Sequence, residues 1–158
     1  MNKGTKFFTF FLRVSLGWVL FYAAWTKIQT PGWSSAGYLK GAQTFVGFYD
    51  FLLQPGFLPI VNFFNQWGVL LVGAALILGI FVRLSSFLGA LLMILYYLPV
   101  LSFPYIKPHS FLVDEHIVYA LALLVLGGLR AGQIWGLENW CKSLPICSRY
   151  PRLRNFFG

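Results

Sequence analysis

The stretch 111–129 has the sequence FLVDEHIVYALALLVLGGL. It has the length and apolar character of a helix that crosses a membrane, yet near its start stand three consecutive ionisable residues, Asp114, Glu115 and His116. Such side chains need a partner within a membrane, because an ionised carboxylate in lipid is strongly unfavourable. The stretch therefore predicts both a membrane-spanning helix and a candidate functional site.

Two interpretations of the three ionisable residues stay open. If the helix begins at Ser110, they lie in its first two turns near the membrane surface, where the helix dipole and headgroup water stabilise carboxylates. Alternatively, they line a polar pocket that faces the bundle. In that case a desolvated carboxylate can take up or release protons, so Asp114, Glu115 and His116 are the candidate catalytic residues.

The composition indicates an integral membrane protein. Hydrophobic residues make up 58% of the 158 residues, charged residues make up 10%, and the mean hydropathy is +0.71, which leaves too little polar surface for a soluble domain. The net charge of +8 would favour nucleic acid as the partner of a soluble protein, but these basic residues flank apolar runs or lie in the C-terminal segment. The expected partner is the lipid bilayer, and no nucleic acid is expected.

Four apolar runs predict an all-α membrane protein whose domain, residues 1–138, is a four-transmembrane-helix bundle. The expected spans are about 7–26, 59–82, 84–101 and 111–130. An additional amphipathic helix is expected on the outer side over about 34–53, because Lys40 and Asp50 disfavour a fifth span. Residues 139–158 are expected to form a basic cytoplasmic tail.

The distribution of basic residues predicts the topology. Eight lysines and arginines lie on the side of the two termini, whereas only Lys27, Lys40 and Lys107 lie on the other side of the expected membrane. Short loops with more lysine and arginine stay in the cytoplasm. Both termini are therefore expected to be cytoplasmic.

Arg13 lies within the first expected span and is a candidate for substrate binding. It either extends its guanidinium to the membrane surface or faces the bundle and binds an anion. Thr9 and Gly17, four residues away on either side, make that helix face small and polar. This pattern favours the bundle.

Three further residues are candidates for substrate binding. Lys27 and Tyr119 are expected to line one pocket with Glu115 and His116 under the amphipathic segment, with Lys27 paired to one of the neighbouring carboxylates. Gln66 lies at the outer end of the second span, where it can hydrogen-bond across helices or to a bound headgroup.

The sequence contains no phosphate loop, dinucleotide fingerprint, nucleophile elbow or haem-attachment motif. Cys141 and Cys147 lie on the expected cytoplasmic side, where thiols are kept reduced, so a working redox pair is not favoured. His109 and His116 with the nearby acids are weak evidence for a metal site. We therefore expect no metal, and no cofactor-binding residue is evident.

Three segments together resemble the DoxX/DoxD-like family of small four-helix membrane proteins. They are Arg13 and Gly17 in a first helix that ends at Lys27, GVLLVGAALILGIFVRLSSFLGA over 68–90, and GGLRAGQIWGLE over 127–138. The last is the most specific, because family members leave the final helix through a Gly-rich turn that contains arginine. The resemblance covers roughly 7–138 and implies a multi-pass protein of a bacterial or archaeal cytoplasmic (inner) membrane.

The resemblance also implies a class of activity. The DoxD branch is the membrane subunit of a thiosulfate:quinone oxidoreductase, and other members are redox-associated. The first hypothesis is therefore a subunit of a quinone-linked redox system, with the oxidation of sulfur compounds as one option, quinone as its cofactor and a membrane or periplasmic partner subunit. The second is a non-catalytic accessory subunit of a larger membrane complex, and the third is a small carrier or channel. Whether the chain is itself an enzyme stays open.

Overall fold

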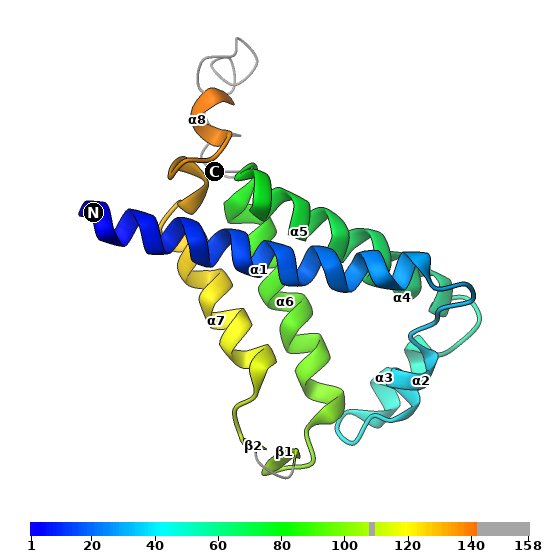
Figure 1. Ribbon diagram of the computed structural model, residues 1–158. Helices are drawn as coiled ribbons and strands as arrows, with labels where there is room; N and C mark the ends of the chain where they lie inside the picture. The colour runs from blue at the N-terminus through cyan, green and yellow to red at the C-terminus, as the bar shows by residue number, and fades with distance from the viewer. Residues whose placement is uncertain (108–109, 142–158) are drawn as a thin grey trace.

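The computed structural model describes residues 1–107 and 110–141 (Figure 1). In this part of the chain, three helices are long and apolar enough to cross a membrane: Lys3–Gln29, Leu58–Leu78 and Val82–Val100. A shorter apolar helix, Glu115–Gly128, is the fourth member of the bundle. The protein is an all-α membrane protein, as the sequence predicts.

The first crossing, α1 (Lys3–Gln29), extends beyond the expected span 7–26 at both ends. Asn2 is its N-cap, and the Oδ1 atom of this residue accepts a hydrogen bond from the backbone N–H of Thr5 at 2.7 Å. The helix ends just before Pro31, which has no N–H to continue the hydrogen-bond ladder.

Three consecutive segments form the second crossing: α4 (Leu58–Phe63), the π-helix η1 (Phe64–Gly68) and α5 (Val69–Leu78). The crossing ends before the expected residue 82 because Gly79 adopts a left-handed conformation with φ of +70°. The backbone of α5 nearly touches that of α1, since a Cβ atom at Gly73 would lie 2.5 Å from the backbone nitrogen of Phe21. Glycine is required there for this close packing.

The third crossing is α6 (Val82–Val100), and α7 (Glu115–Gly128), a 14-residue helix that we group with the crossings although it is shorter than the other three, packs along it. Two short antiparallel strands follow α6, β1 (Tyr105–Lys107) and β2 (Ser110–Phe111). The fourth helix is shorter than the expected span 111–130, because the chain before it is extended and paired in this hairpin.

The four crossings form two pairs, α1 with α5 and α6 with α7. Figure 1 shows the pairs close together at the end where the N-terminus lies, near the 3-10 helix η2 (Ala131–Gln133), and further apart at the opposite end. We call the first the terminal end and the second the loop end. Apolar residues from all four crossings fill the core, including Leu20, Leu76, Met93 and Leu123.

Residues 34–53, which we call the bridge segment, lie at the loop end (Figure 1). They form two short helices, α2 (Ala36–Lys40) and α3 (Val46–Leu52), where the sequence suggests one amphipathic helix. The helix is interrupted between them, and Phe45, directly before α3, has a φ of +55° that no regular helix contains.

The bridge segment is attached to the end of α6 by hydrogen bonds to backbone carbonyls. The hydroxyl of Tyr49 donates to the carbonyl oxygen of Leu95 at 3.0 Å. Within a helix, this carbonyl would accept from the residue four positions later, but that residue is Pro99, which has no N–H. Thr44 Oγ1 likewise donates to the carbonyl of Leu101 at 2.5 Å. Pro99 thus leaves the carbonyl of Leu95 without a donor in the helix, and Tyr49 of the bridge segment supplies one.

The segment expected to form the cytoplasmic tail, 139–158, is described only at its start. The short helix α8 (Glu138–Cys141) begins it. Residues 142–158, including Cys147, lie outside the described residues, as does His109.

Candidate functional site

Asp114 determines where α7 begins. It is the N-cap residue, and its Oδ1 atom accepts hydrogen bonds from the backbone N–H groups of His116 at 3.0 Å and Ile117 at 3.4 Å. Its side chain is buried. The helix therefore starts at Glu115 and not at Ser110, so the premise of the surface interpretation is wrong, and the buried carboxylate of Asp114 is stabilised as the N-cap by the first N–H groups of α7.

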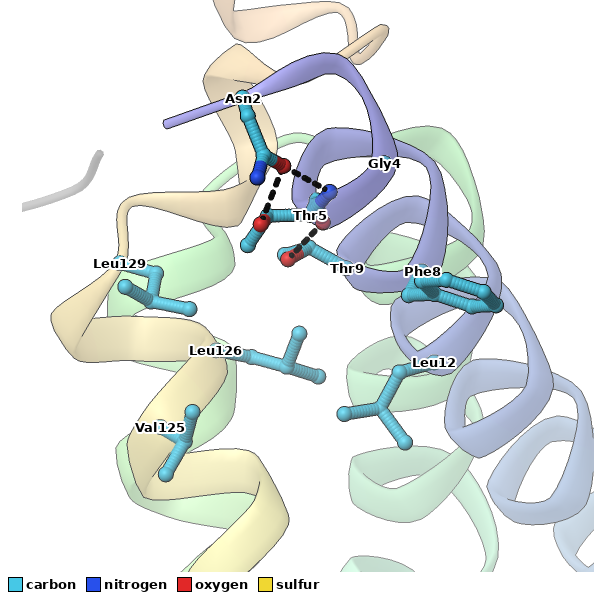
Figure 2. A pocket seen from close by; sticks show the side chains of 9 residues that line it. All are labelled: Asn2, Gly4, Thr5, Phe8, Thr9, Leu12, Val125, Leu126 and Leu129. Carbon is cyan, nitrogen blue, oxygen red and sulfur yellow. Dashed lines mark hydrogen bonds between the residues drawn. The ribbon is translucent and has the colours of Figure 1, made fainter.

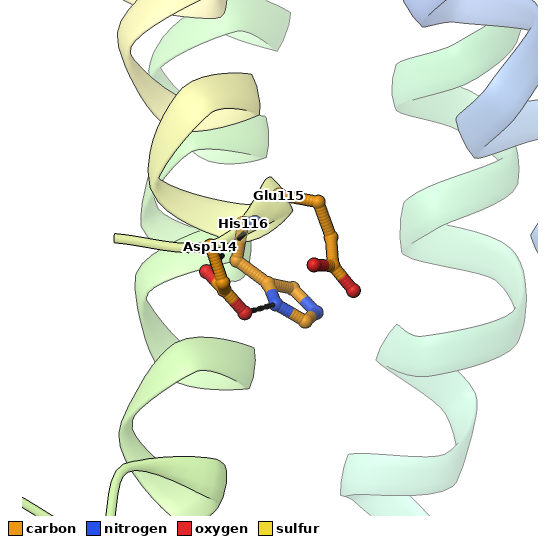
Figure 3. A group of neighbouring side chains, drawn as sticks. All are labelled: Asp114, Glu115 and His116. Atoms are coloured by element: carbon orange, nitrogen blue, oxygen red, sulfur yellow. Dashed lines mark hydrogen bonds and ion pairs between the residues drawn. The ribbon is translucent and has the colours of Figure 1, made fainter. Parts of the chain in front are cut away.

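The same carboxylate orients the imidazole of His116. Nδ1 of His116 donates to Oδ2 of Asp114 at 2.6 Å (Figure 3). This contact fixes the ring and leaves Nε2 for another partner. His116 is only partly buried, so its ring has access to molecules at the loop end.

Tyr96 of α6 links this histidine to the second crossing. Its ring centroid lies 6.2 Å from that of His116, with the rings edge to face. Its hydroxyl donates to Oδ1 of Asn65 at 2.6 Å. Asn65 belongs to the π-helix η1, and such insertions within α-helices are frequent at functional sites.

Lys27, in the last turn of α1, directs its ammonium at two aromatic rings. Nζ lies 5.2 Å from the ring centroid of Trp33 and 5.4 Å from that of Tyr96, which are cation–π distances. The backbone carbonyl of Lys27 accepts a hydrogen bond from Nε2 of Gln66 at 3.4 Å. Lys27, Gln66, Tyr96 and His116 are thus connected at the loop end, and we call them with Asp114 the loop-end site.

The expected ion pair between Lys27 and a carboxylate is not observed among the described residues. The reason is local: the carboxylate of Asp114 is already occupied by the first N–H groups of α7 and by His116. The rings of Trp33 and Tyr96, and not a carboxylate, surround the ammonium of Lys27.

A second buried polar cluster lies at the terminal end. Arg13 is fully buried, so the prediction that it faces the bundle is confirmed. Its Nη1 atom lies between two glycines, since a Cβ atom at either Gly79 or Gly136 would collide with it. Within the described part of the chain its guanidinium nitrogens make no hydrogen bond, but the negative charge of Glu138 attracts it.

A model of the DoxX family matches residues 8–101. The chain belongs to the DoxX family. The match contains Arg13, Lys27, Gln66 and Tyr96, whereas α7 lies beyond it in this DoxX protein. No curated protein and no solved structure matches the chain.

The other predicted site residues of this DoxX protein lie near the loop-end site. Tyr119 is half-buried one turn into α7 and packs against the core. Glu115 is exposed, and one ligand-type atom from each of Asp114, Glu115 and His116 lies within 4.8 Å of the others. Acidic groups with this spacing are common without a metal, so the three residues alone do not indicate a metal centre.

Sequence reasoning missed the aromatic part of this DoxX protein's loop-end site. Tyr96 and Trp33 surround Lys27, and Tyr38 of α2 donates a hydrogen bond from its hydroxyl to the carbonyl of Tyr96. The signal available was the pair Tyr96 and Tyr97 near the end of an apolar run, where aromatic residues usually anchor a helix at the membrane surface.

The DoxX protein also has an apolar hollow of about 440 Å³ between α1 and α7 at the terminal end (Figure 2). Its polar side chains are engaged with one another: Asn2 Oδ1 accepts from Oγ1 of Thr5 at 2.6 Å, and Oγ1 of Thr9 donates to the carbonyl of Thr5 at 2.7 Å. They serve to start α1, so this hollow is not a candidate site.

Proposed function

We propose that this DoxX protein is the membrane subunit of a quinone-linked redox system, and that the loop-end site binds the polar head of the quinone. One observation carries the proposal. Three crossings bring an ammonium, an aromatic ring and a carboxylate-bound imidazole together at one end of the bundle, from Lys27, Tyr96 and His116.

The chemistry of these groups matches that of a quinone head. A quinone has two carbonyl oxygens that accept hydrogen bonds and a flat ring that packs on aromatic faces. The ammonium of Lys27 and Nε2 of His116 are donors of the required kind. Because the site opens at the end of apolar helices, an isoprenoid tail could remain in lipid while the head reaches these donors.

The pair of His116 and Asp114 supplies the proton function. Reduction of a quinone to a quinol consumes two electrons and two protons, and histidine exchanges protons near neutral pH. The carboxylate of Asp114 holds the ring in one orientation. The electrons come from a partner subunit that oxidises a donor such as a reduced sulfur compound, because the sequence carries no motif for an electron carrier.

The proposed location is a bacterial or archaeal cytoplasmic membrane with both termini in the cytoplasm. The excess of lysine and arginine on the side of the termini supports this orientation. The loop-end site then lies at the outer surface, where a periplasmic partner can reach it. Labelling of single cysteines introduced at positions 40 and 142 tests this orientation, because the two positions must then lie on opposite sides of the membrane.

The experiment for the quinone is a titration of the purified protein with a short-chain quinone, followed by intrinsic fluorescence. Lys27→Gln removes the ammonium donor and is expected to weaken binding about tenfold, since hydrogen bonds to charged groups contribute ~1.5–3 kcal/mol. Lys40→Gln is the matched control, because Lys40 is exposed at the same end and outside the site. Absence of quinone binding, or equal affinity for all three proteins, contradicts the proposal.

A second candidate, a non-catalytic subunit of a larger membrane complex, is favoured by the outer face of α1. Trp18, Tyr22 and Trp25 are exposed there. The aromatic rings stack along the helix, with Trp18 against Phe21 and Tyr22, and Phe21 against Trp25. Such a face packs against lipid or against a neighbouring subunit. Co-purification with a larger complex in fixed ratio, without quinone binding, would favour this candidate.

A further inference from the structure

A groove of about 380 Å³ lies between α6 and α7 at the terminal end, away from the loop-end site. Arg83, at the start of α6, and Arg130, just after α7, both line it and both are exposed. Its sides are apolar and include Phe87 and Leu124, and no carboxylate among the described residues lines it. The groove thus combines two positive charges with a hydrophobic wall.

The floor of this groove contains a polar group that the chain does not satisfy. Ser86 is 1% exposed, and its Oγ atom has no hydrogen-bond partner among the described residues. A buried hydroxyl without a partner is unfavourable, and native proteins rarely leave one. Ser86 is one of the residues that line the groove, so a ligand that enters beside it can supply the missing partner.

Two consecutive glycines keep the groove open on the side of α7. A Cβ atom at Gly127 would lie 3.2 Å from Cβ of Ser86, so a larger residue would crowd the serine. A Cβ atom at Gly128 would meet nothing within 4 Å, which shows that the space beside it is empty of protein.

We propose that the groove binds an acidic phospholipid. Its phosphate lies between Arg83 and Arg130, an ester oxygen accepts from Oγ of Ser86, and one acyl chain follows Phe87 and Leu124. Basic pockets between membrane helices are suited to acidic headgroups, and guanidinium groups bind phosphate with paired hydrogen bonds. Arg83 also has a contact within the chain, but its five N–H donors can serve more than one partner.

Native mass spectrometry of the detergent-purified protein tests the proposal, with phosphatidylglycerol and phosphatidylcholine of identical acyl chains as probes. The wild-type protein is expected to retain phosphatidylglycerol in preference to phosphatidylcholine. The double variant Arg83→Gln with Arg130→Gln is expected to lose this preference, by roughly fivefold for each arginine. The control is Lys3→Gln with Lys6→Gln, which removes the same charge outside the groove and is expected to keep the preference.

A second variant separates the groove from general attraction by charge. Gly128→Leu fills the empty space beside α7 while both arginines remain, and the open surroundings of Gly128 allow the helix to accept it. Bound phosphatidylglycerol is expected to fall severalfold relative to wild type. Equal retention of the two lipids by the wild type, an equal loss in the lysine control, or unchanged binding in Gly128→Leu would overturn the proposal.

Discussion

The carboxylate of Glu138 accepts a hydrogen bond at 2.8 Å from the backbone N–H of Val82, which lies at the first position of α6. A negative charge at a helix N-terminus is favourable, because the first N–H groups there have no partner within the helix. The backbone N–H of Glu138 also donates to the carbonyl of Gly79 at 3.0 Å. The segment after α7 is therefore joined to the turn between α5 and α6, directly beside buried Arg13.

The first prediction concerns the charge of Glu138. Glu138→Leu removes the acceptor for Val82 and the negative charge near buried Arg13, and a buried cation left without a compensating charge costs on the order of 3 kcal/mol or more. Thermal unfolding in detergent should show this as a large loss of stability. The double variant with Arg13→Met should recover part of the loss, because no unpaired charge then stays buried.

The control for this prediction is Glu115→Leu, which removes an exposed carboxylate from the other end of the bundle. Its loss should stay below ~1 kcal/mol, the range of exposed charges. If the losses of Glu138→Leu and Arg13→Met simply add, the two charges do not stabilise each other and the terminal cluster is held by packing alone.

The second prediction concerns Gly79. Alanine there must adopt a φ of +70°, which costs about 1–2 kcal/mol for a residue with a Cβ atom, and its Cβ would also collide with Nη1 of Arg13. Gly79→Ala should therefore destabilise the protein by more than the backbone strain alone. Gly37→Ala, at a helical glycine with nothing within 4 Å, should be neutral or slightly stabilising in the same unfolding assay.

The sequence predicted the positions of the membrane-spanning helices well, because the length of an apolar run depends only on local composition. It placed the start of the fourth helix too early, since Ser110 and Asp114 are both possible N-caps and sequence alone could not rank them. In the structure, Ser110 is paired in β2 and Asp114 is the cap. The pairing of Ser110 with β1 is a contact between different parts of the chain, and this contact decides which of the two possible N-caps starts the helix.

The candidate sites were predicted only in part for the same reason. The burial of Arg13 followed from the small residues on its own helix face, but its partner Glu138 lies in a distant segment. Conversely, Lys27 was expected to pair with a carboxylate because opposite charges attract. The carboxylate of Asp114 instead accepts hydrogen bonds from its own helix. Tertiary packing places the ring of Tyr96 beside the ammonium of Lys27.

The third prediction concerns alkaline pH. Partial burial at the loop end raises the pKa of Tyr38 to about 12 from 10.0, helped by the nearby negative charges of Asp114 and Glu115 and, once it ionises, of Tyr49. Above pH 10.0 the unfolded chain loses this proton while the folded chain keeps it, so the free energy of unfolding should fall until about pH 12.

The measurement is the unfolding midpoint of the wild type and of Tyr38→Phe as a function of pH. The variant should lose some stability at neutral pH, because the hydrogen bond to the carbonyl of Tyr96 is gone, but its midpoint should fall less steeply above pH 10.0. An identical slope for the two proteins would show that Tyr38 ionises equally in the folded and unfolded states.

The last prediction distinguishes the aromatic surroundings of Lys27 from an ion pair. Its ammonium lies 5.4 Å from the ring of Tyr96, and a cation over an aromatic face contributes ~0.5–2 kcal/mol depending on desolvation. In a double-mutant cycle, Lys27→Met and Tyr96→Leu should therefore show a coupling energy in this range. Lys27→Met and Asp114→Asn should show almost none, because that carboxylate acts on His116 and on its own helix.

Tyr96→Phe completes the comparison, because Tyr96 makes a second contact that the leucine variant also removes. Phenylalanine keeps the ring face but loses the hydroxyl that donates to Asn65 at 2.6 Å. In the cycle with Lys27→Met, Tyr96→Phe should therefore show almost no coupling, although the variant itself is less stable than wild type by about 1 kcal/mol because the hydrogen bond to Asn65 is lost. If Tyr96→Phe couples to Lys27→Met as strongly as Tyr96→Leu does, the hydroxyl network and not the ring holds the lysine. If Lys27→Met instead shows a larger coupling energy with Asp114→Asn than with Tyr96→Leu, Lys27 forms an ion pair with Asp114 in solution and does not depend on its aromatic neighbours.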